Sequence, residues 1–143
     1  MKIHQISLFL ENKPGHLNAI CRTLAENDIN IVTLSLADTQ QFGIVRLIVE
    51  EWEKARDVLE QAGYVVNVRE VVAATVADKP GGMAELLDSI GKTGVNIEYM
   101  YAFTSKHNAE AVLVFRFDDP DKAIEALKAS GRNVLNAPVL FAK

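Results

Sequence analysis

Two short segments of this sequence combine residue types that could bind a small zwitterion. Asn12-Lys13-Pro14-Gly15 and Asp78-Lys79-Pro80-Gly81 each follow a run of alternating apolar residues and precede a helical pattern. A helix N-terminus offers unpaired backbone N–H groups and the positive end of the helix dipole, so it can hold a carboxylate without a basic side chain. The side-chain oxygen of Asn12 or Asp78 could hold an ammonium group beside it. Proline and glycine at such a junction also have a purely structural use, because they start a helix.

Neighbouring residues complete the candidate binding set. They are the first helical residues His16, Leu17, Gly82 and Met83, and the recurring pairs Asn30-Ile31 and Asn96-Ile97. Each asparagine opens the second strand of its copy. Asparagine is also common at helix-to-strand turns for structural reasons, because it tolerates left-handed backbone geometry. His16 is explained equally well as an exposed residue of a first helical turn.

Both segments belong to a repeat that covers most of the chain. Residues 12–31 align without gaps to residues 78–97, at an offset of 66. Residues 54–66 recur as 122–134, at an offset of 68. The change places two additional residues of the second copy near Ser105 to Asn108, a stretch typical of a turn, where insertions cost little. The period predicts a duplicated small domain, with copies at residues 1–69 and 70–143.

Each copy has the pattern of a βαββαβ unit. In the first copy the apolar spacing predicts strands at about 3–11, 29–37, 43–50 and 64–69. It predicts helices from Pro14-Gly15 to Asn27-Asp28 and over 52–62. In the second copy it predicts strands near 71–77, 95–104, 109–117 and 133–141, and helices near 82–93 and 120–130.

This element order predicts an α+β fold. Two right-handed crossovers interleave to give an antiparallel sheet of order 4-1-3-2 with both helices on one face, as in ferredoxin-like domains. Strand two is then a sheet edge, which is normally covered or paired. If the copies join edge to edge through these strands, Asn96 lies beside the Asn12 loop and Asn30 beside the Asp78 loop. Tyr99 and Tyr101 are candidates to line such pockets, and packing on the edge strand is the alternative.

The duplicated pattern resembles the ACT domain, an amino-acid-sensing module attached to many biosynthetic enzymes. It is similar in particular to the serine-binding ACT domain of phosphoglycerate dehydrogenase, where an Asn–basic–Pro–Gly loop and an asparagine opening strand two bind the effector. The first copy matches both motifs, at residues 12–15 and Asn30, whereas the second has Asp78 in place of the first asparagine. A histidine that precedes the loop in those relatives is Leu10 here and Val76 in the second copy.

The resemblance implies a stand-alone regulatory module that is not an enzyme. It implies that a free amino acid binds between two ACT domains and that the chain controls a partner enzyme of amino-acid metabolism, with a homodimer compatible with the edge strand. A structural adaptor that binds another chain through the sheet edge is one alternative, and a small ferredoxin-like enzyme is another. The sequence has no clustered nucleophile and base to support the enzyme.

The composition of the chain argues against several classes of partner, namely nucleic acids, metal ions, cofactors and membranes. Residues 1–70 carry 7 Lys/Arg and 10 Asp/Glu, and residues 71–143 carry 8 and 9, so neither half has the positive field that nucleic-acid binding requires. Cys21 is the only cysteine and the three histidines are scattered, so the sequence predicts no disulfide, metal site or cofactor. The first residues lack the apolar core of a signal peptide, and no apolar run approaches the roughly 20 residues that cross a bilayer. We therefore expect a soluble, cytoplasmic protein without a membrane partner.

Overall fold

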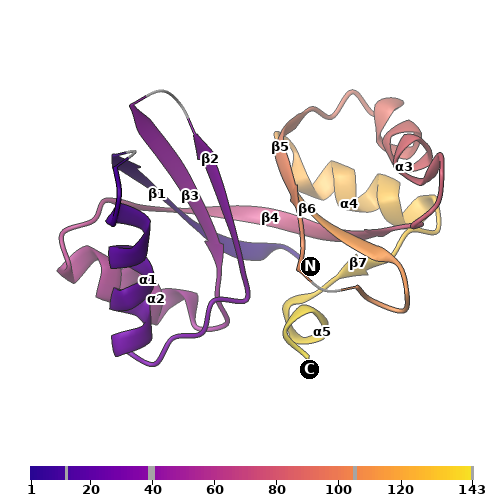
Figure 1. Ribbon diagram of the computed structural model, residues 1–143. Helices are drawn as coiled ribbons and strands as arrows, with labels where there is room; N and C mark the ends of the chain where they lie inside the picture. Colours follow the sequence, from indigo (N-terminus) through magenta and orange to yellow (C-terminus); the bar gives the residue numbers. More distant parts are fainter. Residues whose placement is uncertain (12, 39–40, 105, 143) are drawn as a thin grey trace. The chain divides into compact units, whose positions relative to one another are not determined.

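The computed structural model describes residues 1–11, 13–38, 41–104 and 106–142. The chain divides into two compact units, one spanning His4–Arg69 and the other combining Glu70–Lys143 with Met1–Ile3. The elements in chain order (Figure 1) are β1 (Ile3–Glu11), α1 (His16–Glu26), β2 (Thr33–Asp38), β3 (Phe42–Ile48), α2 (Trp52–Gln61), β4 (Val66–Val76), α3 (Gly82–Gly91), β5 (Ile97–Ala102), β6 (Ala111–Phe117), α4 (Pro120–Ala129), β7 (Val134–Leu135) and α5 (Ala137–Phe141).

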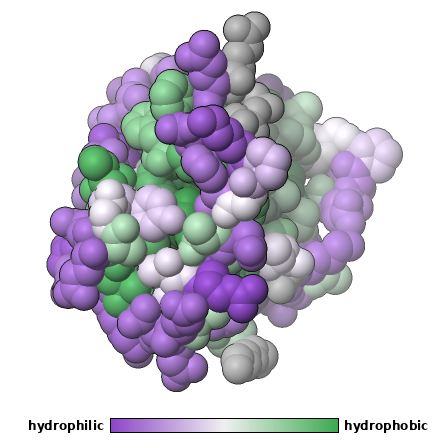
Figure 2. Space-filling model, turned by 60° about the vertical axis from the view of Figure 1, so that its left-hand side comes forward, coloured by the Kyte–Doolittle hydropathy of each residue, from purple (hydrophilic) through white to green (hydrophobic). Residues whose placement is uncertain are grey.

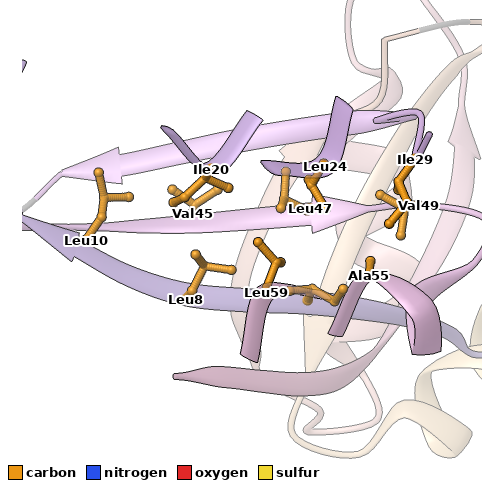
Figure 3. Packing of buried hydrophobic residues seen from close by; sticks show 11 residues of the cluster. Leu8, Leu10, Ile20, Leu24, Ile29, Val45, Leu47, Val49, Ala55 and Leu59 are labelled. Carbon is orange, nitrogen blue, oxygen red and sulfur yellow. The ribbon is translucent and has the colours of Figure 1, made fainter. Parts of the chain in front are cut away.

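The first unit has the expected sheet and a core on one side of it. Its strands follow the order β2-β3-β1-β4, which is the predicted 4-1-3-2 order, and α1 and α2 cover one face (Figure 1). Alternate residues of a strand point to the same face. Figure 3 shows side chains of β1 and β3 pointing toward those of α1 and α2. The buried cluster includes Leu8, Leu10, Val45, Leu47, Ile20, Leu24, Ala55 and Leu59.

The second unit repeats this arrangement. Its strands follow the order β5-β6-β4-β7, and α3 and α4 cover one face (Figure 1). The buried cluster includes Val72, Ala74, Leu86, Ile90, Phe115, Phe117, Ala123 and Leu127. Ala123 and Leu127 fill the positions that Ala55 and Leu59 fill in the first unit, so the duplication extends to the core.

A single strand, β4, includes the last predicted strand of the first copy and the first predicted strand of the second. The predicted strands at 64–69 and 71–77 form a single strand, β4, because neither glycine nor proline interrupts residues 66–76. β4 is a neighbour of β1 in the first unit's order. Its second half pairs with β6 in the second unit, where Val72 lies opposite Phe115.

Two predicted strands are wrong in their extent. The strand expected at 133–141 is only the two residues of β7, because α5 follows at once. The Asn136 side chain accepts a hydrogen bond from the N–H of Val139 at 3.1 Å, and Pro138 cannot donate to a strand ladder. The strand expected at 29–37 begins only at Thr33, because the N–H of Ile29 instead donates to the Leu24 carbonyl and closes the end of α1.

Apolar side chains also reach the surface. Figure 2 shows hydrophobic residues exposed among hydrophilic ones on the face turned toward the viewer. Phe9 and Phe42, on the neighbouring strands β1 and β3, are 61% and 50% exposed. Among the described helices, none has both the length and the apolar character needed to cross a membrane.

Candidate functional site

The first candidate segment forms a type II turn that leads into α1. The N–H of His16 donates to the Lys13 carbonyl at 3.3 Å, which closes a four-residue turn. Pro14 takes its second position, and Gly15 takes its third with φ 87° and ψ −14°. A type II turn requires positive φ at that position, which glycine adopts without steric cost. Asn12, the residue before this turn, lies outside the described residues.

The second candidate segment repeats the turn. The N–H of Gly82 donates to the Lys79 carbonyl at 3.0 Å, and Gly81 has φ 85° and ψ −10°. The N–H of Lys79 also donates to the carbonyl two residues earlier at 2.9 Å, as the N–H of Lys13 does at 2.8 Å. Both copies therefore present the same backbone at the start of the helix.

The turn leaves backbone donors available at each helix start. It uses the N–H of the first helical residue, and neither α1 nor α3 has a side-chain cap. Leu17 and Asn18 in α1, and Met83 and Ala84 in α3, have N–H groups without an acceptor among the described residues. The start of α4 differs, because the Asp119 side chain caps it. Two unpaired N–H groups at the positive end of a helix dipole favour an anion.

A pocket of about 370 Å³ adjoins the first turn. It is lined by Phe9, Leu10, Glu11, His16, Ala19 and Tyr64. At its edge the Lys13 Nζ lies 2.8 Å from the Glu11 Oε2. This hydrogen bond lowers the pKa of Glu11 and raises the pKa of Lys13. Of the predicted residues, the structure thus places His16 in the pocket.

A pocket of about 510 Å³ adjoins the second turn. It is lined by Val76, Ala77, Asp78, Lys79, Pro80, Met83, Ala111 and Leu113. Gly82 is buried, and a Cβ added there would collide with the Ala77 carbonyl oxygen. The position that carries the His16 ring in the first copy therefore has no room for a side chain in the second.

Asp78 already has a cationic partner. The Lys106 Nζ lies 2.7 Å from the Asp78 Oδ2, and this hydrogen bond lowers the pKa of Asp78. Lys106 precedes a tight hairpin, in which His107 and Glu110 exchange backbone hydrogen bonds of 3.0 and 2.9 Å. The hairpin lies where the second copy has its two-residue insertion. Sequence reasoning noted that insertion as a tolerated turn and missed the lysine that it supplies.

The structure does not bring Asn30 or Asn96 to the turn of its own unit. Asn30 follows the C-terminal end of α1 and lines a separate hollow with Asp28 and Glu50. An eleven-residue helix is about 16 Å long, which separates Asn30 from the turn at the other end of α1. Asn96 follows α3 in the same way, and its N–H donates to the Asp118 side chain at 2.9 Å.

Most of the remaining predicted residues have structural roles. Leu17 and Ile31 pack against the first core, and Met83 and Ile97 pack against the second. A register shift within β5 separates Ile97 from the residues after it.

The two tyrosines of β5 lie outside the second pocket. Tyr99 and Tyr101 lie opposite Arg116 and Val114 of β6. Residues 115 and 117 of β6 belong to the core under the helices, so residues 114 and 116 face the other side of the sheet. That Tyr99 and Tyr101 line a pocket together with a second unit stays a prediction.

Comparison with known proteins identifies the domain type. The sequence matches the ACT domain pair over residues 1–136. The chain belongs to this family. The match spans both units, and the ACT pair has the duplicated α+β fold described above. No curated protein matches the sequence.

Several solved structures resemble this ACT domain pair. Protein BT0572 from Bacteroides thetaiotaomicron is 38% identical, with a TM-score of 0.91 over 100% of this chain and 98% of its own. The regulatory subunit of aspartate kinase from Thermus thermophilus is 18% identical, with a TM-score of 0.66 over 89% of this chain and 91% of its own. The corresponding subunit from Thermus flavus is 18% identical, with a TM-score of 0.62 over 92% and 94%. The two subunits share the fold.

Proposed function

We propose that this ACT domain pair binds a free amino acid at its Lys-Pro-Gly turns and thereby regulates a partner enzyme of amino-acid metabolism. The observation that carries the proposal is the repetition of one turn. In each copy a left-handed glycine starts a helix with available N–H groups, beside a pocket of about 370 or 510 Å³. Both volumes fall within the roughly 300–1,000 Å³ typical of small-molecule sites.

In the proposed complex, the helix start after the turn binds the ligand carboxylate, and the residue before the turn binds the ligand ammonium. The ligand carboxylate accepts hydrogen bonds from the second and third N–H groups of the helix, where the helix dipole favours negative charge. In the first copy these donors are Leu17 and Asn18. The ligand ammonium donates to the side-chain oxygen of Asn12 in the first copy, or of Asp78 in the second.

A complete site needs a second ACT unit. Asn30 and Asn96 precede strand two of their units and lie at the far end of α1 or α3 from the turn of the same unit. Asn30 therefore cannot join the Gly15 turn of its own unit. We propose that Asn96 completes the pocket at Gly15 and that Asn30 completes the one at Gly81. The second unit comes from another copy in a homodimer, because β2 and β5, which the proposed pairing would join, are not neighbours in the described sheet order.

Regulation is supported by the family and by the fold. Two of the structural neighbours are regulatory subunits of aspartate kinase, and each matches about nine-tenths of this chain. We propose the same kind of task here, with the enzyme supplied by a separate chain and the ACT pair acting without catalysis.

A thermal-shift screen of the twenty L-amino acids tests the proposal. A ligand present at about 100 times its dissociation constant adds about 2.7 kcal/mol to the free energy of unfolding, which raises the melting temperature by several degrees. The matched control is the amine left when the carboxylate of the best amino acid is removed. The proposal predicts stabilisation by the amino acid but not by the amine. No stabilisation by any amino acid, or equal stabilisation by the amine, contradicts it.

A further inference from the structure

The ion pair between Lys106 and Asp78 joins the same chemical groups as the proposed contact between ligand and protein. The Lys106 Nζ, an alkylammonium group, lies 2.7 Å from the Asp78 Oδ2. Asp78 lines the second pocket and stands at the position that holds the ligand ammonium in the proposed function. We infer that Lys106 occupies this position in place of the ligand, so that the second pocket binds an amino acid more weakly than it would without Lys106. This inference rests on the proposed function.

The occupying lysine is specific to the second copy. It enters with the longer hairpin between β5 and β6, at the shift of the repeat offset from 66 to 68. The corresponding stretch of the first copy, residues 38–41, contains Asp, Thr, Gln and Gln and therefore no cation. In the first copy the loop lysine Lys13 pairs with Glu11, whose counterpart is Ala77. Lys106 therefore makes the two pockets unequal.

Electrostatics at Asp78 agrees with this geometry. The hydrogen bond from Lys106 lowers the pKa of Asp78, so the carboxylate is charged and paired at neutral pH. A ligand ammonium that approaches Asp78 must displace Lys106 and then remain near its positive charge. Like charges at short range repel, which adds to the cost of displacement.

A ligand can enter the second pocket in two ways, and the way that loses less affinity sets the effect of Lys106 on binding. A ligand that leaves the ion pair intact forgoes a charge-assisted hydrogen bond, which weakens binding about tenfold or more. A ligand that displaces Lys106 breaks an exposed ion pair, which weakens binding up to about fivefold. Displacement is the cheaper route. Removing the Lys106 charge is therefore expected to tighten binding at the second pocket by about 1.5- to fivefold.

The test measures binding at each pocket separately in the full chain. Backbone amide NMR signals of Gly15 and His16 report the first pocket, and those of Gly81 and Gly82 report the second, while each of the twenty L-amino acids is titrated in turn. The variant is Lys106→Gln, which keeps a polar side chain without the charge. The matched control is Lys92→Gln, which removes the charge of another exposed lysine of the same unit. Both side chains of the ion pair are more than half exposed, so the fold is expected to survive.

The outcomes separate the inference from the proposed function. We expect Lys106→Gln to lower the dissociation constant at the second pocket by about 1.5- to fivefold and to leave the first pocket unchanged, with no effect of Lys92→Gln. Asp78→Asn, which restores the loop sequence of the first copy and removes the ion pair, is expected to bring the two pockets closer in affinity. Binding at both pockets with no gain at the second from Lys106→Gln overturns the inference alone. No response at either pocket overturns the proposed function and the inference with it.

Discussion

Gly15 and Gly81 adopt the same left-handed backbone conformation, with φ of 87° and 85°, at the same point of the two copies. Each follows a proline and is the residue from which a helix begins. This φ lies in a region that residues with a Cβ rarely adopt. The identity of the two turns therefore depends on glycine at both positions.

Replacing either glycine by alanine is expected to strain the turn. Nothing lies within 4 Å of a Cβ added at Gly15 or Gly81, so the cost is that of the backbone alone. We expect Gly15→Ala and Gly81→Ala each to lower the free energy of unfolding by about 1–2 kcal/mol in urea denaturation. Gly91→Ala is the matched control, because Gly91 ends α3 with open space around it and without positive φ. Equal effects of all three substitutions would contradict the turn geometry.

The cores of the two copies predict a second pair of effects. Leu59 and Leu127 occupy equivalent helix positions, and both are fully buried. We expect Leu59→Ala and Leu127→Ala each to cost about 2–5 kcal/mol of unfolding free energy, because each leaves a cavity under its helix. Leu87→Ala, at a residue that is 39% exposed, serves as the control and should cost much less. A small loss of unfolding free energy from either substitution would argue against equivalent cores in the two units.

Much of this fold follows from local patterns in the sequence. The turns were predictable because proline fixes its own φ and the glycine after it adopts positive φ without steric cost. The repeat of this pair at the same point of both copies indicated the same elements around each turn. The helix α5 was not predicted, because Val134 to Phe141 is apolar enough for a strand. The cap by Asn136 and the missing donor of Pro138 decide the outcome there.

The site was less predictable than the fold. Spacing predicts Asp78 as a binding residue but does not reveal its partner. Lys106 is 28 residues away along the chain, and only the fold of the β5–β6 hairpin brings it to Asp78. Likewise, Tyr64 and Phe9 line the first pocket through the packing of separate elements, which no local motif encodes.

The Asp78–Lys106 ion pair predicts a specific pH dependence. Because the folded-state pKa of Asp78 is lowered, the contribution of the pair to stability is present above the unfolded-state pKa and is lost as the pH falls through the folded value. In an NMR titration of the side-chain carboxyls, we expect Lys106→Gln to raise the midpoint of Asp78 toward its ordinary value. Glu11, whose pKa is lowered by Lys13 instead, is the internal control and should not move. An unchanged Asp78 midpoint would mean that the pair does not form in solution.

Removing the proposed ammonium acceptor of the first copy should weaken amino-acid binding. Asn12→Ala deletes a charge-assisted hydrogen bond, so calorimetry should show an affinity roughly 10- to 150-fold lower. Asn96→Ala is expected to give a similar loss, because the asparagine of a second chain completes the first pocket in the proposed homodimer. Asn133→Ala, at an exposed residue next to β7, is the control. A loss from Asn12→Ala without a loss from Asn96→Ala would assign each site to a single unit.

The most direct test of amino-acid binding at these turns is the response of the helix-start amides. The backbone N–H signals of Leu17 and Asn18 should shift on addition of the amino acid that stabilises the chain most, because these groups donate to its carboxylate. The signals of Asn27 and Asp28, at the other end of α1, should move far less. A shift centred elsewhere, with Leu17 and Asn18 unmoved at saturation, would contradict the account.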